Sequence, residues 1–115
     1  MSGEWMDLHR GLALILAGNI NEAERILREE ASRDDWRIPA NLGRIQEGRR
    51  IISAALASYE AAAELVREDK EAAQIQLRIS RCLEALGRHS ESRRALQYAL
   101  ELDPDNLHIH RELRR

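Results

Sequence analysis

The amino-acid sequence predicts an all-α fold, an α-α superhelix of about three helical hairpins followed by a short C-terminal capping helix. Three observations lead to this prediction. Strong helix formers (Ala, Leu, Glu and Arg) dominate the 115 residues, whereas aromatic residues, which β-rich domains use heavily, make up only 3%. Turn-forming residues divide the chain into segments of helix length. Two of these segments repeat each other's pattern of small and large residues at a distance of 69 residues, from Gly18 to Gly87.

The N-terminal third is predicted to hold two helices. The first covers about residues 4–17 and ends at the Gly18-Asn19 breaker. Its apolar residues fall on two sides, which is typical of a helix held between two neighbours. The second is predicted to start near Asn21, an N-cap residue that is followed three residues later by Glu24.

The middle of the chain is predicted to hold a third and a fourth helix. Pro39 suits the first turn of the third helix, because a first-turn residue needs no N–H donor within the helix. This helix is predicted to end within residues 47–50, and the fourth to cover residues 51–66. The alternative is one unbroken helix over residues 40–68. Its two interior glycines disfavour that alternative, because each costs about 1 kcal/mol inside a helix.

Three further helices are predicted toward the C-terminus. Asp69-Lys70 is taken as a weak boundary before a fifth helix at about residues 71–86. The sixth begins near Ser90 and must stop before Pro104, which has no N–H and disfavours a helical residue ahead of it. Residues 107–115 are predicted to form a short seventh helix, either a cap or the opening of a further repeat.

An internal repeat is the strongest signal in the sequence. Each copy has a turn residue, a small residue five positions later and a large residue four positions after that. The copies read Gly18-x4-Ala23-x3-Leu27, Arg50-x4-Ala55-x3-Tyr59 and Gly87-x4-Ser92-x3-Leu96. The 69 residues between the outer copies are close to twice a period of about 34. In the middle copy Arg50 replaces the turn glycine, and taking Gly48 as the turn instead shifts the register by two.

At these residues the chain resembles the tetratricopeptide repeat family, over roughly residues 4–106. The family places a small residue upstream of each turn, here Gly11, Gly43 and Ser80, and Leu42-Gly43 reproduces its Leu-Gly pair. The tail Ala-Leu-Glu-Leu-Asp-Pro-Asp-Asn at residues 99–106 matches its usual ending, which the first two copies lack. An apolar position of the pattern is Leu14 and Leu83 in the outer copies but polar Gln46 in the middle one. The resemblance implies one domain, residues 1–115, with repeats at about 4–35, 36–69 and 73–106 and a cap or further repeat at 107–115.

The resemblance also implies a concave groove lined mainly by the first helix of each repeat. The side chains expected to face it are apolar in the first repeat and mostly charged in the other two. They are Trp5, Leu8, Leu12 and Ile15; Arg37, Ala40, Arg44 and Glu47; and Gln74, Leu77, Arg81 and Glu84. An apolar anchor beside arginines suits an amphipathic helix or an extended peptide with an acidic group. The alternative is that the apolar stripe packs against the chain's own terminal helix or another subunit.

The expected function is therefore a scaffold or adaptor that binds a partner protein or peptide in this groove. The alternatives are self-association into a homo-oligomer and a regulatory fragment of a larger tetratricopeptide protein. Some co-chaperones of the family grip a C-terminal carboxylate with Lys, Asn and Arg on the same faces. Only Arg81 clearly agrees with that pattern, which argues against such a specificity.

Charge and motif content speak against several other classes. The net charge is −2, with 18 basic and 20 acidic side chains, whereas a nucleic-acid-binding protein usually shows a basic excess. The N-terminus has no basic segment typical of a signal peptide, and no apolar run is long enough for a membrane span. Neither phosphate-loop nor catalytic motifs occur, and the four histidines lack ligand spacing, so we expect no enzyme, cofactor or metal site. The single cysteine, Cys82, is predicted to be a core residue and fits a reducing, cytoplasmic location.

Overall fold

The computed structural model describes residues 20–29 and 35–115, and these residues form helices and turns without any strand. The helices are α2 (Ile20–Glu29), α3 (Arg37–Gly48), α4 (Ile52–Leu65), α5 (Asp69–Ala85), α6 (His89–Leu102) and α7 (Leu107–Arg114). The predicted first helix and the turn at Gly18 lie outside the described residues. The predicted all-α class is confirmed.

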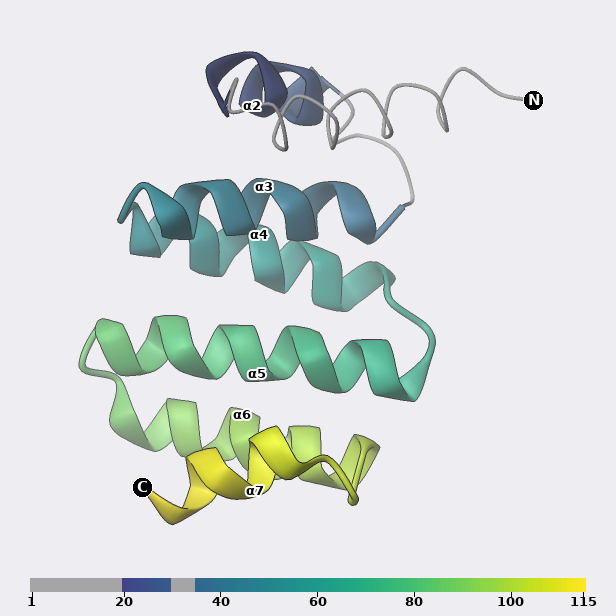
Figure 1. The fold of residues 1–115 in the computed structure, drawn as a ribbon, viewed down its shortest axis with the longest axis vertical. Helices are drawn as coiled ribbons and strands as arrows, with labels where there is room; N and C mark the ends of the chain where they lie inside the picture. The colour runs from purple at the N-terminus through teal and green to yellow at the C-terminus, as the bar shows by residue number, and fades with distance from the viewer. Residues whose placement is uncertain (1–19, 30–34) are drawn as a thin grey trace.

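The helices stack side by side along the long axis of the molecule (Figure 1). α3 and α4 form one antiparallel hairpin, α5 and α6 form the next, and α4 packs on α5. In the view of Figure 1, α3, α5 and α7 lie toward the viewer, while α4 and α6 lie behind them. The first helices of successive hairpins therefore share one face, as expected for an all-α helical repeat.

Most helix boundaries match the predictions. Pro39 lies in the first turn of α3, and a turn separates α3 from α4, so the single long helix is excluded. Asn21 was predicted as an N-cap but is the second residue of α2. The predicted boundary at residues 69–70 is instead the first turn of α5, which begins at Asp69 and holds acidic side chains favoured by the helix dipole. His89 is exposed as the first residue of α6.

The turns of the two hairpins are built alike. Arg50 (φ 64°) and Gly87 (φ 78°) both have left-handed backbone conformations. After each, the next residue donates its N–H to a carbonyl five positions back, from Ile51 to Gln46 (2.9 Å) and from Arg88 to Leu83 (2.8 Å). This is the hydrogen bond that closes a Schellman motif at the end of a helix. The turn of the middle copy is therefore at Arg50, and the alternative register with Gly48 is excluded.

The small positions of the repeat allow neighbouring helices to approach closely. A Cβ atom added to Gly43 would lie 2.8 Å from Cε1 of Tyr59, a fully buried ring on α4. In the next hairpin Ser80 stands at the position of Gly43 and Ser92 at that of Ala55; both serines are buried, and Ser92 Oγ donates a hydrogen bond to the carbonyl of Ser80 (2.9 Å). The small residues thus bring α3 onto α4 and α5 onto α6.

Gln46, the polar residue at an apolar position of the pattern, has a local explanation. Its side chain is buried, and its Oε1 accepts a hydrogen bond from Ser58 Oγ on α4 (2.6 Å). Because a buried amide without a partner costs about 1–3 kcal/mol, this pair makes the departure from the pattern tolerable.

α7 closes the C-terminal end of the stack. The side chain of Asn106 caps it by accepting hydrogen bonds from the backbone N–H groups of His108 (3.0 Å) and Ile109 (3.4 Å). Ile109 is fully buried against Ala73 of α5 and Ala99 of α6. α7 therefore lies where the first helix of a further hairpin would lie.

Candidate functional site

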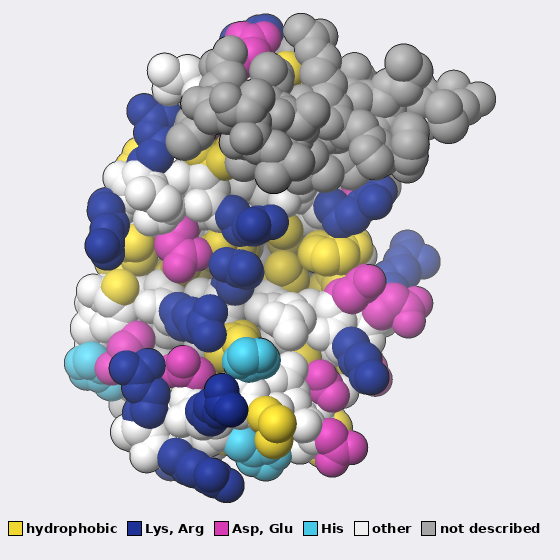
Figure 2. Space-filling model, viewed as in Figure 1, with side chains coloured by type: hydrophobic (Ala, Val, Ile, Leu, Met, Phe, Trp, Pro, Cys, Tyr) yellow, Lys and Arg dark blue, Asp and Glu magenta, His cyan; other side chains and the backbone are white. Residues whose placement is uncertain are grey.

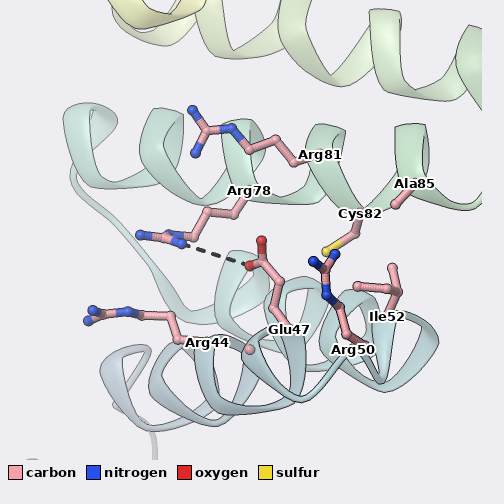
Figure 3. Close-up of a pocket in the computed structure, with 9 residues that line it drawn as sticks. Arg44, Glu47, Arg50, Ile52, Arg78, Arg81, Cys82 and Ala85 are labelled. Carbon is pink, nitrogen blue, oxygen red and sulfur yellow. Dashed lines mark ion pairs between the residues drawn. The ribbon is translucent and has the colours of Figure 1, made fainter.

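A recess of about 510 Å³ lies between α3 and α5, on the face formed by the first helices of the hairpins. Figure 3 shows the side chains that line it: Arg44, Glu47, Arg50, Ile52, Arg78, Arg81, Cys82 and Ala85, together with Gly48. α3 and α5 supply most of them because the same face of each helix turns toward this side of the molecule.

The recess is strongly basic. It contains four arginines and one glutamate, which leaves a net charge of +3 on a chain whose total net charge is −2. Arg78 and Arg81 form long ion pairs, with Glu47 (3.8 Å) and Glu112 of α7 (3.7 Å) respectively. Within the part of the chain that the structure describes, Arg44 and Arg50 form no ion pair. Their guanidinium groups are available to an anion.

Glu47 is the single carboxylate that lines this recess, and a hydrogen bond from a core residue holds it in place. Its Oε1 accepts a hydrogen bond of 2.7 Å from the hydroxyl of Tyr59, a residue that belongs to the core. The same oxygen faces Nη1 of Arg78, whose guanidinium lies 6.0 Å from the centre of the Tyr59 ring. Burial, together with the neighbouring Glu47, raises the pKa of Tyr59 well above its ordinary value. Tyr59 therefore stays protonated and continues to donate to Glu47 at neutral pH.

The end of the recess nearest the hairpin turns is apolar. Ile52, Cys82 and Ala85 lie together there, with the guanidinium of Arg50 beside them (Figure 3). Burial is the main cause that raises the pKa of the Cys82 thiol to about 11, and the charge of Glu47 acts in the same direction. The thiol is therefore protonated at neutral pH and is a poor nucleophile.

A second recess, of about 650 Å³, continues the first toward the C-terminus between α5, α6 and α7. Arg81 and Ala85 line both recesses. The charged groups of the second recess are more evenly matched, because Glu112 contacts Arg81 (3.7 Å) and Arg115 (3.3 Å), and His89 contacts Glu84 (2.9 Å). Figure 2 shows this face of the molecule, with Lys and Arg side chains in dark blue along the levels of α3, α5 and α7.

The structure brings together only part of the predicted groove set. Arg44, Glu47 and Arg81 line the first recess, and Arg81 and Glu84 line the second. Trp5, Leu8, Leu12 and Ile15 lie outside the described residues.

Four other expected groove residues line neither recess. Arg37 is held by Asp35, with 2.8 Å between the guanidinium and the carboxylate, and this hydrogen bond lowers the pKa of Asp35. Gln74 is exposed elsewhere on α5. Leu77 is only 2% exposed and Ala40 only 6%, so both are core residues that offer no contact surface.

Sequence reasoning missed several residues of the first recess, above all Arg50 and Arg78. Arg78 lies three residues before Arg81, a spacing that places both on one helix face, so this signal was present in the sequence. Arg50 was read only as a substitute for a turn glycine. Its position in the recess follows from the left-handed turn and could not be read from helical spacing.

Comparisons with known proteins agree with the architecture. No protein-family profile matches the chain, and no curated protein sequence matches it. Among solved structures, the first tetratricopeptide repeat domain of Spaghetti (RPAP3), bound to the HSP90 peptide SRMEEVD, is 19% identical with a TM-score of 0.84, covering 96% of this chain and 87% of that one. The N-terminal domain of stress-induced protein-1 from C. elegans is 13% identical with a TM-score of 0.87, covering 97% and 92%.

A third similar structure is the type III secretion chaperone SycD of Yersinia enterocolitica in complex with a peptide of the translocator YopD. It is 17% identical with a TM-score of 0.83, covering 95% of this chain and 88% of that one. At such identities the similarity shows the fold, which is that of tetratricopeptide repeat domains. The fold implied by the motifs around Gly43 and in residues 99–106 is confirmed.

Two further properties concern the described residues. None of their helices has the length and apolar character that crossing a bilayer requires. They also contain no group of three or more His, Cys, Asp or Glu side chains arranged to hold a metal ion.

Proposed function

We propose that this tetratricopeptide-type helical repeat binds an extended acidic segment of a partner protein in the recess between α3 and α5. The observation that carries the proposal is the convergence of four arginines, two of them without an ion-pair partner among the described residues, around a recess with one apolar end. Guanidinium groups form strong, directional hydrogen bonds with carboxylates. The ligand would place an acidic side chain among the arginines and an aliphatic one near Ile52 and Ala85.

Two of the similar structures support this use of the fold, because each is a complex with a peptide. One of those peptides, SRMEEVD, is itself acidic. The present recess differs from a grip on a terminal carboxylate, since only Arg81 agrees with that pattern. The acidic segment would instead be recognised through Arg44, Arg50 and Arg78 as well.

The proposal describes a binding module and not an enzyme, since Cys82 is buried and both its burial and the charge of Glu47 keep the thiol protonated. We assign the groove to the face shared by repeats at about 36–69 and 73–106, with the remaining residues as flanking repeat and cap. A reducing, cytoplasmic location is part of the proposal, because Cys82 is a free cysteine and free thiols are typical of reducing compartments.

The test uses a fluorescent octapeptide of alternating glutamate and leucine, and an analogue in which glutamine replaces every glutamate. Fluorescence polarisation should show binding of the acidic peptide that weakens as salt is raised, and weaker binding of the analogue. The double variant Arg44→Glu/Arg81→Glu should lose at least about tenfold in affinity, because two attractive charges become repulsive.

The matched control is Arg67→Glu/Arg94→Glu, the same change in net charge at two exposed arginines outside both recesses. Both double variants should keep the thermal stability of the parent. Equal loss of binding in the two double variants would reject the recess as the site. Sedimentation velocity of the unlabelled chain over the same concentrations separates peptide binding from the alternative, self-association: a concentration-independent monomer removes that alternative.

A further inference from the structure

We propose that Glu47 limits how tightly the groove binds acidic ligands: its carboxylate faces Arg78 in the free protein, competes with a ligand carboxylate for that guanidinium and repels the ligand's negative charge. This inference rests on the proposed function and names the residue that regulates it. Glu47 lies in the basic recess and contacts groups on two other helices, Tyr59 of α4 and Arg78 of α5.

The carboxylate of Glu47 is held by a short hydrogen bond, whereas the guanidinium of Arg78 has only longer contacts, to Glu47 and to the Tyr59 ring. Tyr59 donates a hydrogen bond of 2.7 Å to Oε1 of Glu47, and Tyr59 itself is fully buried, so the carboxylate has an anchor in the core. The contact from the same oxygen to Nη1 of Arg78 is 3.8 Å, beyond hydrogen-bond distance. The two side chains are similarly exposed, Arg78 at 36% and Glu47 at 32%, so the difference between them lies in these contacts. Because Glu47 has the shorter contact, we infer that Arg78 turns toward a ligand while Glu47 stays in place.

A ligand carboxylate at Arg78 consequently meets attraction from the arginines and repulsion from Glu47 at the same time (Figure 3). Every anionic group that comes near Glu47 meets this repulsion, so Glu47 lowers the affinity that the arginines alone would give. Two like charges about 5 Å apart change an equilibrium by about fourfold at the dielectric constant of water, and more when solvent is partly excluded.

The next hairpin provides a natural comparison. Glu84 stands 37 residues after Glu47, as Arg81 stands 37 residues after Arg44, so the two glutamates occupy equivalent positions on α3 and α5. Glu84, however, contacts His89 at 2.9 Å and lines the second recess. Removing either charge changes the total charge equally, but only Glu47 faces Arg78.

The opposite role for Glu47 would be to hold Arg78 in the orientation that a ligand needs. The two roles predict opposite signs. If Glu47 repels the ligand, removing its charge tightens binding. If Glu47 positions Arg78, removing its charge weakens binding.

The experiment compares Glu47→Gln with Glu84→Gln, using the glutamate–leucine octapeptide as the probe. Glutamine keeps an Oε1 that can accept the Tyr59 hydrogen bond, so the fold should be preserved, and thermal unfolding verifies this. Glu47→Gln should bind the octapeptide about three- to tenfold more tightly than the parent, and Glu84→Gln less than about twofold. Binding of the glutamine analogue should change little in either variant.

A double-mutant cycle with Arg78→Gln isolates the contact. In the Arg78→Gln background the additional substitution Glu47→Gln should gain less than it does in the parent, because the guanidinium for which the two carboxylates compete is gone and only the direct repulsion is relieved. Weaker binding by Glu47→Gln, or a gain equal to that of Glu84→Gln, would overturn the proposal while leaving the acidic-peptide function intact. If the parent and Glu47→Gln both fail to discriminate the acidic octapeptide from its analogue, the proposed function itself fails.

Discussion

At the scale of single residues, the turn between α3 and α4 contains backbone strain at Arg50 that the turn between α5 and α6 avoids by using Gly87. Arg50 and Gly87 hold equivalent left-handed positions, at φ 64° and 78°. A side chain in this conformation costs roughly 1–2 kcal/mol because its Cβ crowds the following carbonyl, whereas glycine has no such cost. The cost at Arg50 coincides with its place in the basic recess, where its guanidinium lies beside the apolar end.

The substitution Arg50→Gly should therefore stabilise the protein by about 0.5–1 kcal/mol, after allowance for the greater freedom of glycine in the unfolded chain. The reciprocal change, Gly87→Arg, should destabilise it by about 1 kcal/mol, although the space around Gly87 is open. Urea unfolding of both variants measures the two effects. A stability loss in Arg50→Gly would mean that the Arg50 side chain makes contacts that outweigh its backbone strain.

At the scale of helices, the junction of α3, α4 and α5 depends on a glycine and a tyrosine. Gly43 lets the backbone of α3 approach the Tyr59 ring on α4, and the hydroxyl of that ring holds Glu47 next to Arg78 of α5. One close approach thus positions the charged groups of the recess. The Tyr59 side chain therefore serves both the packing of the hairpin and the placement of the charged groups in the recess.

The substitution Gly43→Ala should test this junction. Its new methyl group would lie 2.8 Å from Cε1 of Tyr59, a distance that forces the ring or the helix to move. We expect a net destabilisation of about 1–3 kcal/mol, which outweighs the gain in helix propensity. Differential scanning calorimetry should show the midpoint fall by several degrees.

The matched control for Gly43→Ala is Gly48→Ala in the same helix, where no heavy atom lies within 4 Å of the added carbon. That change should be neutral or stabilising by up to about 1 kcal/mol. Equal destabilisation by both substitutions would show that glycine is needed in α3 for a reason other than its contact with Tyr59.

The helices were predictable from the sequence because their signals are local. Pro39 and Pro104 mark a helix start and a helix end, and the 3.6-residue apolar pattern covers what lies between. The burial of individual side chains was harder to predict. Leu77 was expected in the groove from its place in the repeat, yet it is buried, because its exposure depends on packing between distant helices. Arg78 was missed for the same reason, since only the spacing between α3 and α5 brings it to Glu47.

At the scale of the whole molecule, stacking separates the charges. The first helices of the hairpins gather on one face, and their arginines create a basic recess on a chain that is acidic overall. Each hairpin contacts mainly its neighbours, as in other repeat proteins. A loss of stability at one interface is therefore expected to affect the adjacent hairpin most. The interface nearest the C-terminus is the one that α7 makes with α5 and α6.

The contact of α7 predicts how far a local defect spreads. Ile109 is fully buried against Ala73 and Ala99, so Ile109→Ala should cost about 2–4 kcal/mol, enough to undock a helix of eight residues. Because neighbouring repeats are coupled pairwise, hydrogen exchange should speed up most in α7, less in α6 and α5, and least in α3 and α4. Leu107→Ala, at a side chain that is 68% exposed, should change stability by less than about 0.5 kcal/mol. Equal loss of protection in every helix would show that the stack unfolds as one unit, because a nearest-neighbour chain must lose its end first.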